Sequence, residues 1–325
     1  MKIYDFLYTW GAYEMIIVDM HADTLTKIIN TDQSLYSNKY NIDFNRMKKN
    51  GKYIQTFAAY IDSMYCPANA IKRAIELIDK LHQECMAHND VIMLCRNYND
   101  ILIAFTDKKA PILLSIEGGE ALQGSLSALR MFYMLGVRSI CLTWNHRNEI
   151  ADGVAESISG GGLTVFGRNV VKEMNRLGML IDLSHISEKG FWDVMMSTQQ
   201  PVILSHSNAY KVCPHRRNIN DEQIAAVKKN GGVIGINLYP DFLNESGKAS
   251  IDDAIKHIEY IASVAGEDHI GIGADYDQSE PIFEGIDGIE YTTSILEELL
   301  KKNYSSEAVS KIAGENFLRV IKQVL

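Results

Sequence analysis

Short apolar segments alternate with longer segments of helical periodicity along this 325-residue chain. The short segments are rich in β-branched residues and almost continuously apolar, which is typical of strands buried on both faces of a parallel sheet. The expected strands are residues 16–20, 53–60, 111–116, 138–143, 179–184, 201–205, 232–238 and 269–274. The expected helices between them include residues 70–86, 120–135, 167–177, 221–229 and 250–265. Eight strands in alternation with helices predict a (β/α)8 barrel of the TIM type.

The length of the chain fits one barrel with elaborated loops. We expect a single domain over residues 15–325, preceded by an N-terminal extension over residues 1–14. Residues 61–110 are expected to form two helices, and residues 276–325 a loop over the barrel mouth followed by two helices. A two-domain doubly wound sheet is the structural alternative, but no G-x-G-x-x-G motif follows the first strand.

Charge and composition exclude several classes of partner. The formal net charge is -9 and no run of Lys or Arg exceeds a pair, so we expect no nucleic acid. No segment approaches the roughly 20 consecutive apolar residues of a membrane helix, so we expect no membrane partner. The five cysteines are scattered and form no C-x-x-C pair, and the N-terminus is a poor secretory signal. These features predict a protein of a reducing compartment, the cytoplasm.

Five metal-binding side chains stand at the ends of predicted strands. His21 and Asp23 leave the first strand two positions apart, so that both point to one side in extended backbone. Glu117 directly follows an apolar strand, where a carboxylate must be paired, protonated or metal-bound. His185 and His206 each follow an apolar strand as part of a Ser-His pair. Because the carboxyl ends of barrel strands gather at one face, we expect the five to lie together.

Three imidazoles and two carboxylates exceed the three protein ligands of a catalytic zinc site, which indicates two metal ions. We assign His21 and Asp23 to one ion, His185 and His206 to the other, and Glu117 to both. Zinc suits this set of ligands, and manganese, cobalt or iron are also acceptable. Two ions about 3.5–4 Å apart can hold a bridging hydroxide and polarise a carbonyl, so hydrolysis is the expected reaction. The ordinary alternative is structural: a salt bridge for Glu117 and hydrogen bonds for the histidines.

Other polar candidates follow the same strands. Asp275 closes the last strand and could bind a metal, accept a proton, hold a substrate ammonium or support a ligand histidine. Asp277 is the weaker candidate. At most one member of the adjacent pair Arg216 and Arg217 should face the site, where it would bind a carboxylate. His146 could donate a hydrogen bond to a developing oxyanion or lie on the loop surface.

Five segments occur in the order VDMHADTL, LSIEGGEAL, LIDLSH, VILSHSNAYKVCPHRRNIND and HIGIGADYD. In these segments, and in order from about residue 16 to the C-terminus, the chain resembles the membrane dipeptidase (renal dipeptidase) family, peptidase family M19, which has bacterial members. The resemblance implies a β/α barrel with two zinc ions that hydrolyses dipeptides, tolerates a D-residue at the C-terminal position and forms a homodimer. It also implies the same five metal ligands, with Glu117 bridging.

The resemblance assigns further roles to individual residues. It implies that Arg217 binds the terminal carboxylate of the substrate and that Tyr239 approaches the substrate. It implies that Asp275 meets the substrate amino group and assists proton transfer.

The chain departs from the family pattern at two places. Trp144 stands where mammalian members carry a substrate-contacting histidine, and an indole N–H can donate a hydrogen bond but cannot take a proton. Either His146 substitutes for that histidine, or the metals alone polarise the carbonyl. After the last strand the family commonly reads Asp-Gly, whereas this chain reads Asp277-Gln278.

Two competing hypotheses remain from the sequence. One is a related amidohydrolase with the same metals that acts on N-acyl amino acids or lactones. The other is a catalytically inactive barrel that binds peptides, since folds are known to outlive functions.

Overall fold

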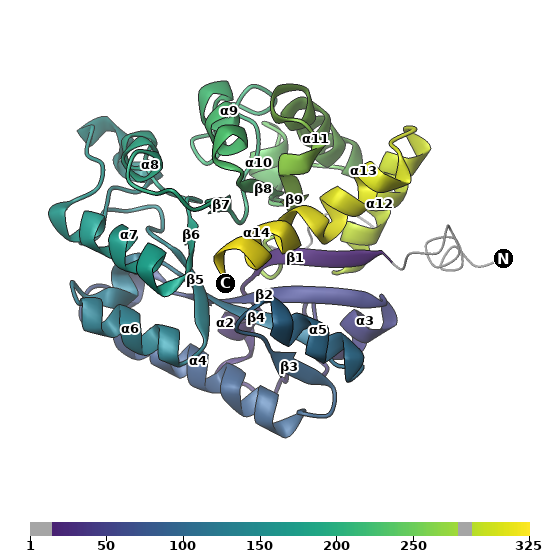
Figure 1. Ribbon diagram of the computed structural model, residues 1–325, viewed down its shortest axis with the longest axis horizontal. Coiled ribbons are helices and arrows are strands. Elements are labelled where there is room, and N and C mark those ends of the chain that lie inside the picture. Colours follow the sequence, from purple (N-terminus) through teal and green to yellow (C-terminus); the bar gives the residue numbers. More distant parts are fainter. Residues whose placement is uncertain (1–14, 279–287) are drawn as a thin grey trace.

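A closed ring of parallel strands forms the centre of the computed structural model, which describes residues 15–278 and 288–325 (Figure 1). The ring consists of β1 (Ile16–Ala22), β2 (Lys52–Tyr60), β4 (Ala110–Glu117), β5 (Val137–Cys141), β6 (Leu180–Asp182), β7 (Ile203–Leu204), β8 (Val233–Ile236) and β9 (Ile270–Ile272). Neighbours pair in the order β2-β1-β9-β8-β7-β6-β5-β4, and pairing of β2 with β4 closes the ring. The predicted TIM-type (β/α)8 barrel is confirmed.

One further strand, β3 (Ile92–Leu94), was not predicted from the sequence. It pairs in parallel with the first residues of β4, from Ala110 to Ile112. The segment between β2 and β4 also contains the two expected helices, α4 (Ala70–Ala87) and α5 (Tyr98–Thr106). Three residues are too few to show a periodicity, so only the pairing with β4 identifies this strand.

Helices surround the barrel (Figure 1). The remaining ones are α2 (Thr24–Ile28), α3 (Phe44–Lys49), α6 (Leu126–Met134), α7 (Val165–Leu177), α8 (Glu188–Met195), α9 (Asp221–Asn230), α10 (Pro240–Leu243), α11 (Ile251–Ala265), α12 (Glu290–Lys301), α13 (Ser306–Ser310) and α14 (Asn316–Val324). The helices predicted at α4, α7, α9 and α11 agree with the structure to within two residues at each end. Among the described residues, no helix is both long enough and apolar enough to cross a membrane.

The predicted helix over residues 120–135 is wrong in its first half. A 3-10 turn (Gly119–Leu122) is followed by Gln123 and Gly124, which have φ angles of 43° and 68°. A right-handed helix cannot continue through two left-handed residues. Ser125 then caps α6, so the helix begins later than its apolar pattern suggests.

The C-terminal helical segment closes the amino end of the barrel. A π-helical turn (Lys311–Glu315) joins α13 to α14, which crosses the strands in Figure 1. Phe317 and Ile321 of α14 belong to one buried apolar cluster with Val18 and Leu113 of the barrel strands. The opposite end of the barrel carries the polar strand ends. The loop predicted over that mouth includes residues 279–287, and the N-terminal extension is residues 1–14; both lie outside the described residues.

Candidate metal centre

Five buried side chains meet at the carboxyl ends of the strands. His21 and Asp23 lie at the end of β1, Glu117 is the last residue of β4, and His185 and His206 follow β6 and β7. Each of these residues is at most 7% exposed. The structure therefore brings together all five residues that the sequence predicted as metal ligands, although they span 186 positions of the chain from His21 to His206.

The two oxygens of Glu117 face different partners. Its Oε1 lies 3.0 Å from His185 Nε2 and 3.4 Å from His206 Nε2. Its Oε2 lies 3.3 Å from His21 Nε2, and Asp23 Oδ1 lies 3.7 Å from the same His21 nitrogen. The carboxylate of Glu117 thus lies between two groups of predicted ligands, His21–Asp23 and His185–His206. One oxygen of Glu117 faces each group.

Several buried atoms at this centre have no hydrogen-bond partner among the described residues. They are His21 Nε2, Asp23 Oδ1, Glu117 Oε2 and Asp275 Oδ1. Leaving a buried polar atom unpaired costs about 1–3 kcal/mol. Two sets of three residues each place one ligand atom per residue within 4.8 Å of the others. The first set is His21, Asp23 and Asp275, and the second is His21, Glu117 and His206. Imidazole nitrogens and carboxylate oxygens are the donors that zinc binds, so the residues present fit a metal centre.

Hydrogen bonds to the far side of two imidazoles determine which nitrogen faces the centre. Ser205 Oγ donates its proton to Asp182, so it must accept from His206 Nδ1, 2.8 Å away. The Nδ1 of His185 lies 2.9 Å from Asn145 Oδ1, which also accepts. A proton on Nδ1 of each ring would satisfy these acceptors and would leave the Nε2 lone pair, which faces the centre, available to a metal. This is the tautomer that a metal requires.

Burial keeps the two histidines in the neutral form. It lowers the pKa of His185 to about 3 and that of His206 well below its ordinary value. Burial also opposes ionisation of Glu117, but His21, His185 and His206 hold the pKa of its carboxyl well below the usual range. Glu117 and Asp23 have the opposite effect on His21 and raise the pKa of its imidazole well above the ordinary value despite burial, so His21 would have to release a proton to a metal.

Three carboxylates, those of Asp23, Glu117 and Asp275, lie close together around His21. Burial, with repulsion from Glu117, raises the pKa of Asp23 to about 7. Burial raises the pKa of Asp275 to about 6, and Glu117 adds to this effect. Bringing a cation among these groups would relieve the repulsion and lower both pKa values.

Two glycines allow the strand ends to approach closely at His206. A Cβ atom at Gly273 would lie 1.7 Å from the carbonyl oxygen of Ser205, and one at Gly235 would lie 2.1 Å from it. Gly235 of β8 and Gly273 of the GIGAD segment therefore serve close packing rather than phosphate binding. They allow the Ser205 backbone to pack closely against the ends of β8 and β9.

Asp275 follows β9, and a hydrogen bond holds one of its two carboxylate oxygens. Its Oδ2 accepts a hydrogen bond of 2.9 Å from Asn237 Nδ2, and its Oδ1 lies 3.8 Å from His21 Nε2. Asp275 and His185 both have left-handed backbones, with φ angles of 62° and 66°. Such strain in residues other than glycine is often found at functional sites.

Asp277 has a structural position instead, since it accepts hydrogen bonds from the backbone and side chain of Asn41 at 2.8 Å.

Only one of the two adjacent arginines is buried, as expected. Arg217 is 4% exposed and donates from Nη2 to the carbonyl oxygen of His206 at 3.0 Å. Its Nε has no hydrogen-bond partner in the described part of the chain, and its guanidinium carbon lies 5.5 Å from the centroid of the Phe242 ring. The Arg216 side chain is exposed.

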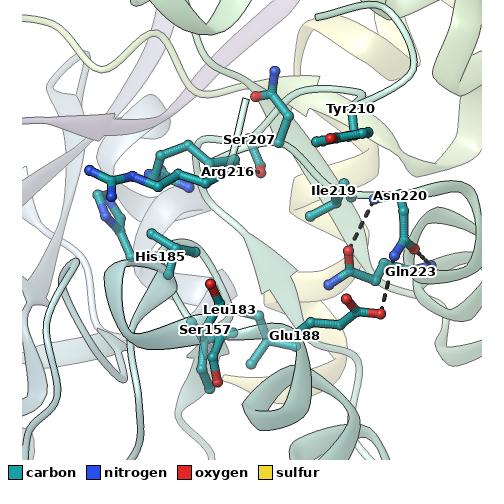
Figure 2. A pocket seen from close by; sticks show the side chains of 15 residues that line it. Ser157, Leu183, His185, Glu188, Ser207, Tyr210, Arg216, Ile219, Asn220 and Gln223 are labelled. Atoms are coloured by element: carbon teal, nitrogen blue, oxygen red, sulfur yellow. Dashed lines mark hydrogen bonds between the residues drawn. The ribbon is translucent and has the colours of Figure 1, made fainter. Parts of the chain in front are cut away.

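A cavity of about 350 Å³ opens beside His185 and Arg217. Figure 2 shows His185 and Arg216 on one side of it, with Glu188 and Gln223 on the other. It provides space next to the metal centre for a small organic molecule.

Comparison with known proteins gives the family. Residues 12–325 match the family profile described as membrane dipeptidase, peptidase family M19. The chain belongs to the membrane dipeptidase family. It is a metal-dependent dipeptide hydrolase, as the resemblance in the sequence implied.

Three relatives show the extent of the similarity. The uncharacterized dipeptidase C965.12 of Schizosaccharomyces pombe is 35% identical over 298 residues, which cover 86% of this chain and 71% of the relative. The crystal structure of dipeptidase AC, of family M19, is 27% identical with a TM-score of 0.88 and covers 95% of this chain and 98% of its own. A metallopeptidase from Rhodobacter sphaeroides, solved with a phosphinate mimic of L-Ala-D-Ala, is 26% identical with a TM-score of 0.89, and covers 96% and 99%.

Trp144, rather than His146, lies next to the metal centre of this dipeptidase. The Trp144 ring centroid is 6.2 Å from that of His185 and 5.4 Å from that of Tyr60. The His146 side chain is 59% exposed and its Nδ1 is 3.8 Å from a carboxylate oxygen of Glu156. The structure does not bring His146 into the cluster.

Tyr239 is half-buried just before α10, and its ring stacks on Phe242 at 4.6 Å. Phe242 in turn lies beside the Arg217 guanidinium. The residue that the family resemblance placed near substrate is therefore linked by stacking to the predicted carboxylate-binding arginine.

Sequence reasoning missed the residues that orient this dipeptidase's predicted ligands. Asn145 contacts His185, Asn237 contacts Asp275, and Gln278 contacts Asp23. Asn145 stands in a polar loop among similar side chains, Asn237 lies within the strand predicted over residues 232–238, and Gln278 was noted only as part of a departure from the family pattern. Their adjacency to a strand end was the only available signal.

Proposed function

We propose that this dipeptidase binds two divalent metal ions, with zinc as the fitting metal, and hydrolyses dipeptides between them. His21 and Asp23 would hold one ion, His185 and His206 the other, and Glu117 both. The observation that carries this proposal is the division of the two Glu117 oxygens between the two groups. When bound, the ions would supply Lewis acidity toward the scissile carbonyl and lower the pKa of the attacking water.

Asp275 is proposed to bind the amino group of the dipeptide and to accept the proton of the attacking water. Its Oδ1 is buried, faces the cluster and has no hydrogen-bond partner among the described residues. Asn237 holds the other oxygen and so fixes the direction of the carboxylate. A free ammonium would satisfy Oδ1, whereas an acylated nitrogen carries no charge to bind there.

Arg217 is proposed to bind the terminal carboxylate of the dipeptide. Its guanidinium is buried beside the cavity, and no described residue hydrogen-bonds to its Nε. Trp144 and Tyr239 are proposed as further substrate contacts. Because an indole cannot transfer a proton and His146 lies away from the cluster, polarisation of the carbonyl is left to the metal centre.

Dipeptides with a D-residue at the C-terminal position are included in the proposed substrate class. The Rhodobacter sphaeroides relative supports this, since its ligand mimics L-Ala-D-Ala. We also propose a homodimer in the cytoplasm without a membrane partner. All five cysteines are unpaired, which suits a reducing compartment.

The test is zinc reconstitution of the metal-free protein followed by a panel of substrates. We expect two zinc ions per chain and hydrolysis of L-Ala-L-Ala and L-Ala-D-Ala. The N-acetylated forms of both dipeptides should be poor substrates, because they carry no ammonium for Asp275. Well under one zinc ion per chain, with no hydrolysis after zinc is added, would refute the proposal. Faster hydrolysis of the N-acetylated forms would instead favour the related amidohydrolase function.

A further inference from the structure

Gln278 lies beside the Asp23 carboxylate. Its Nε2 donates a hydrogen bond of 3.1 Å to Asp23 Oδ2. The other oxygen, Oδ1, has no hydrogen-bond partner among the described residues and lies 3.7 Å from His21 Nε2. The amide of Gln278 thus holds one carboxylate oxygen and leaves the other turned toward the predicted metal centre.

The backbone around this contact is fixed by other hydrogen bonds. The N–H of Asp23 donates to the carbonyl oxygen of Tyr276 at 2.9 Å. Asp277 is 1% exposed and accepts two hydrogen bonds of 2.8 Å from Asn41. The Gln278 amide therefore starts from an ordered segment, and little further ordering is needed for it to reach Asp23.

The Asp23 side chain does not cap the helix that follows it. It is the N-cap residue of α2, yet its side chain makes no capping hydrogen bond. Aspartate at this position usually accepts from a backbone N–H of the first helical turn. Here the carboxylate is turned to Gln278 and to the cluster instead.

We propose that Gln278 is a positioning residue that sets the metal affinity of the His21–Asp23 group. It acts on this group and not on the His185–His206 group, which has its own support from Asn145 and Ser205. The inference rests on the two-metal function proposed above.

The test uses Gln278→Met, which removes both amide hydrogens and keeps an unbranched side chain of similar length. Metal-free wild type and variant are titrated with zinc against a chelating indicator, and the melting temperatures of the metal-free proteins are compared. We expect the variant to bind one zinc ion as wild type does and the other about 10- to 100-fold more weakly. The metal-free melting temperature should not change. Gln83→Met is the matched control, because Gln83 is exposed and bonds only to Asp79 on α4.

The outcomes separate this inference from the proposed function. Two zinc ions bound by the Gln278→Met protein with wild-type affinities would overturn the positioning role and leave the proposed function standing. Wild type that binds fewer than two zinc ions would refute the proposed function itself. Equal weakening of both sites, together with a lower melting temperature of the metal-free variant, would indicate a general structural role and also overturn the inference. Gln278→Ala provides a second variant with the same expected result.

Discussion

Replacing Arg217 by methionine should weaken hydrolysis only for substrates with a free terminal carboxylate. A guanidinium has five N–H donors. Nη2 of Arg217 donates to the carbonyl oxygen of His206, while Nε has no partner within residues 15–278 and 288–325. Hydrogen bonds to charged groups contribute about 1.5–3 kcal/mol each. Loss of one such bond to the substrate therefore predicts a decrease of about 10- to 150-fold in kcat/KM.

The assay compares L-Ala-L-Ala with its C-terminal amide, which has no carboxylate. The Arg217→Met variant should lose activity on the dipeptide and keep most of its activity on the amide. Arg176→Met is the control, since this side chain is 61% exposed on α7, pairs with Glu173 and does not line the cavity, and it should stay within about 3-fold of wild type. Equal losses on both substrates, at an unchanged zinc content, would refute the assignment of the carboxylate to Arg217.

Other predictions follow from the same geometry. Glu117→Gln should reduce the zinc content below two ions per chain and lower dipeptide hydrolysis by at least about 100-fold, because an amide NH2 replaces one of the two oxygens and the negative charge next to both groups is lost; two ions per chain with normal turnover would contradict the bridging role. Gly273→Ala should lower the melting temperature and weaken zinc binding, since its Cβ would lie 1.7 Å from the Ser205 carbonyl oxygen; thermal melts and zinc titration that match wild type would show that this close approach is unimportant. Arg147 holds the pKa of the Asp152 carboxyl below its usual value of 3.8. The pair therefore stabilises the fold above that pH, and the stabilisation is lost as the pH falls through the lowered pKa. Arg147→Met should lower the melting temperature at pH 7, and the difference from wild type should shrink below about pH 4; a difference that stays constant with pH would exclude this ion pair as its cause.

The sequence predicted the strand ends well because one rule governs them. A parallel barrel gathers the carboxyl ends of its strands at one face, so a polar residue after each apolar segment is placed there whatever the loops do. His185 and His206 could be assigned in this way before their contacts were known. The rule does not extend beyond the first residues after a strand. His146 stands only two residues after Trp144, yet it points to solvent.

The features that the sequence did not predict depend on local backbone geometry and on contacts between distant segments. The break at Gln123 and Gly124 interrupts an apolar pattern that is otherwise helical. Strand β3 is defined by its partner rather than by its own residues. The contacts of Asn237 with Asp275 and of Gln278 with Asp23 join residues 38 and 255 positions apart, and such pairings have no signature in a single sequence.

The pairing of β1 with β9 has a consequence for biosynthesis. It joins Asp19 to Ile272, so the first and the last strands of the ring are neighbours. The group formed by His21 and Asp23 faces Asp275 across this seam. His21, Asp23 and Glu117 stand at the ends of β1 and β4, which β2 joins, and His185 and His206 are added by the time β7 has been made. Only Asp275 must wait for the last strand, so the order of synthesis places the predicted metal ligands before the residue proposed to hold the substrate amino group.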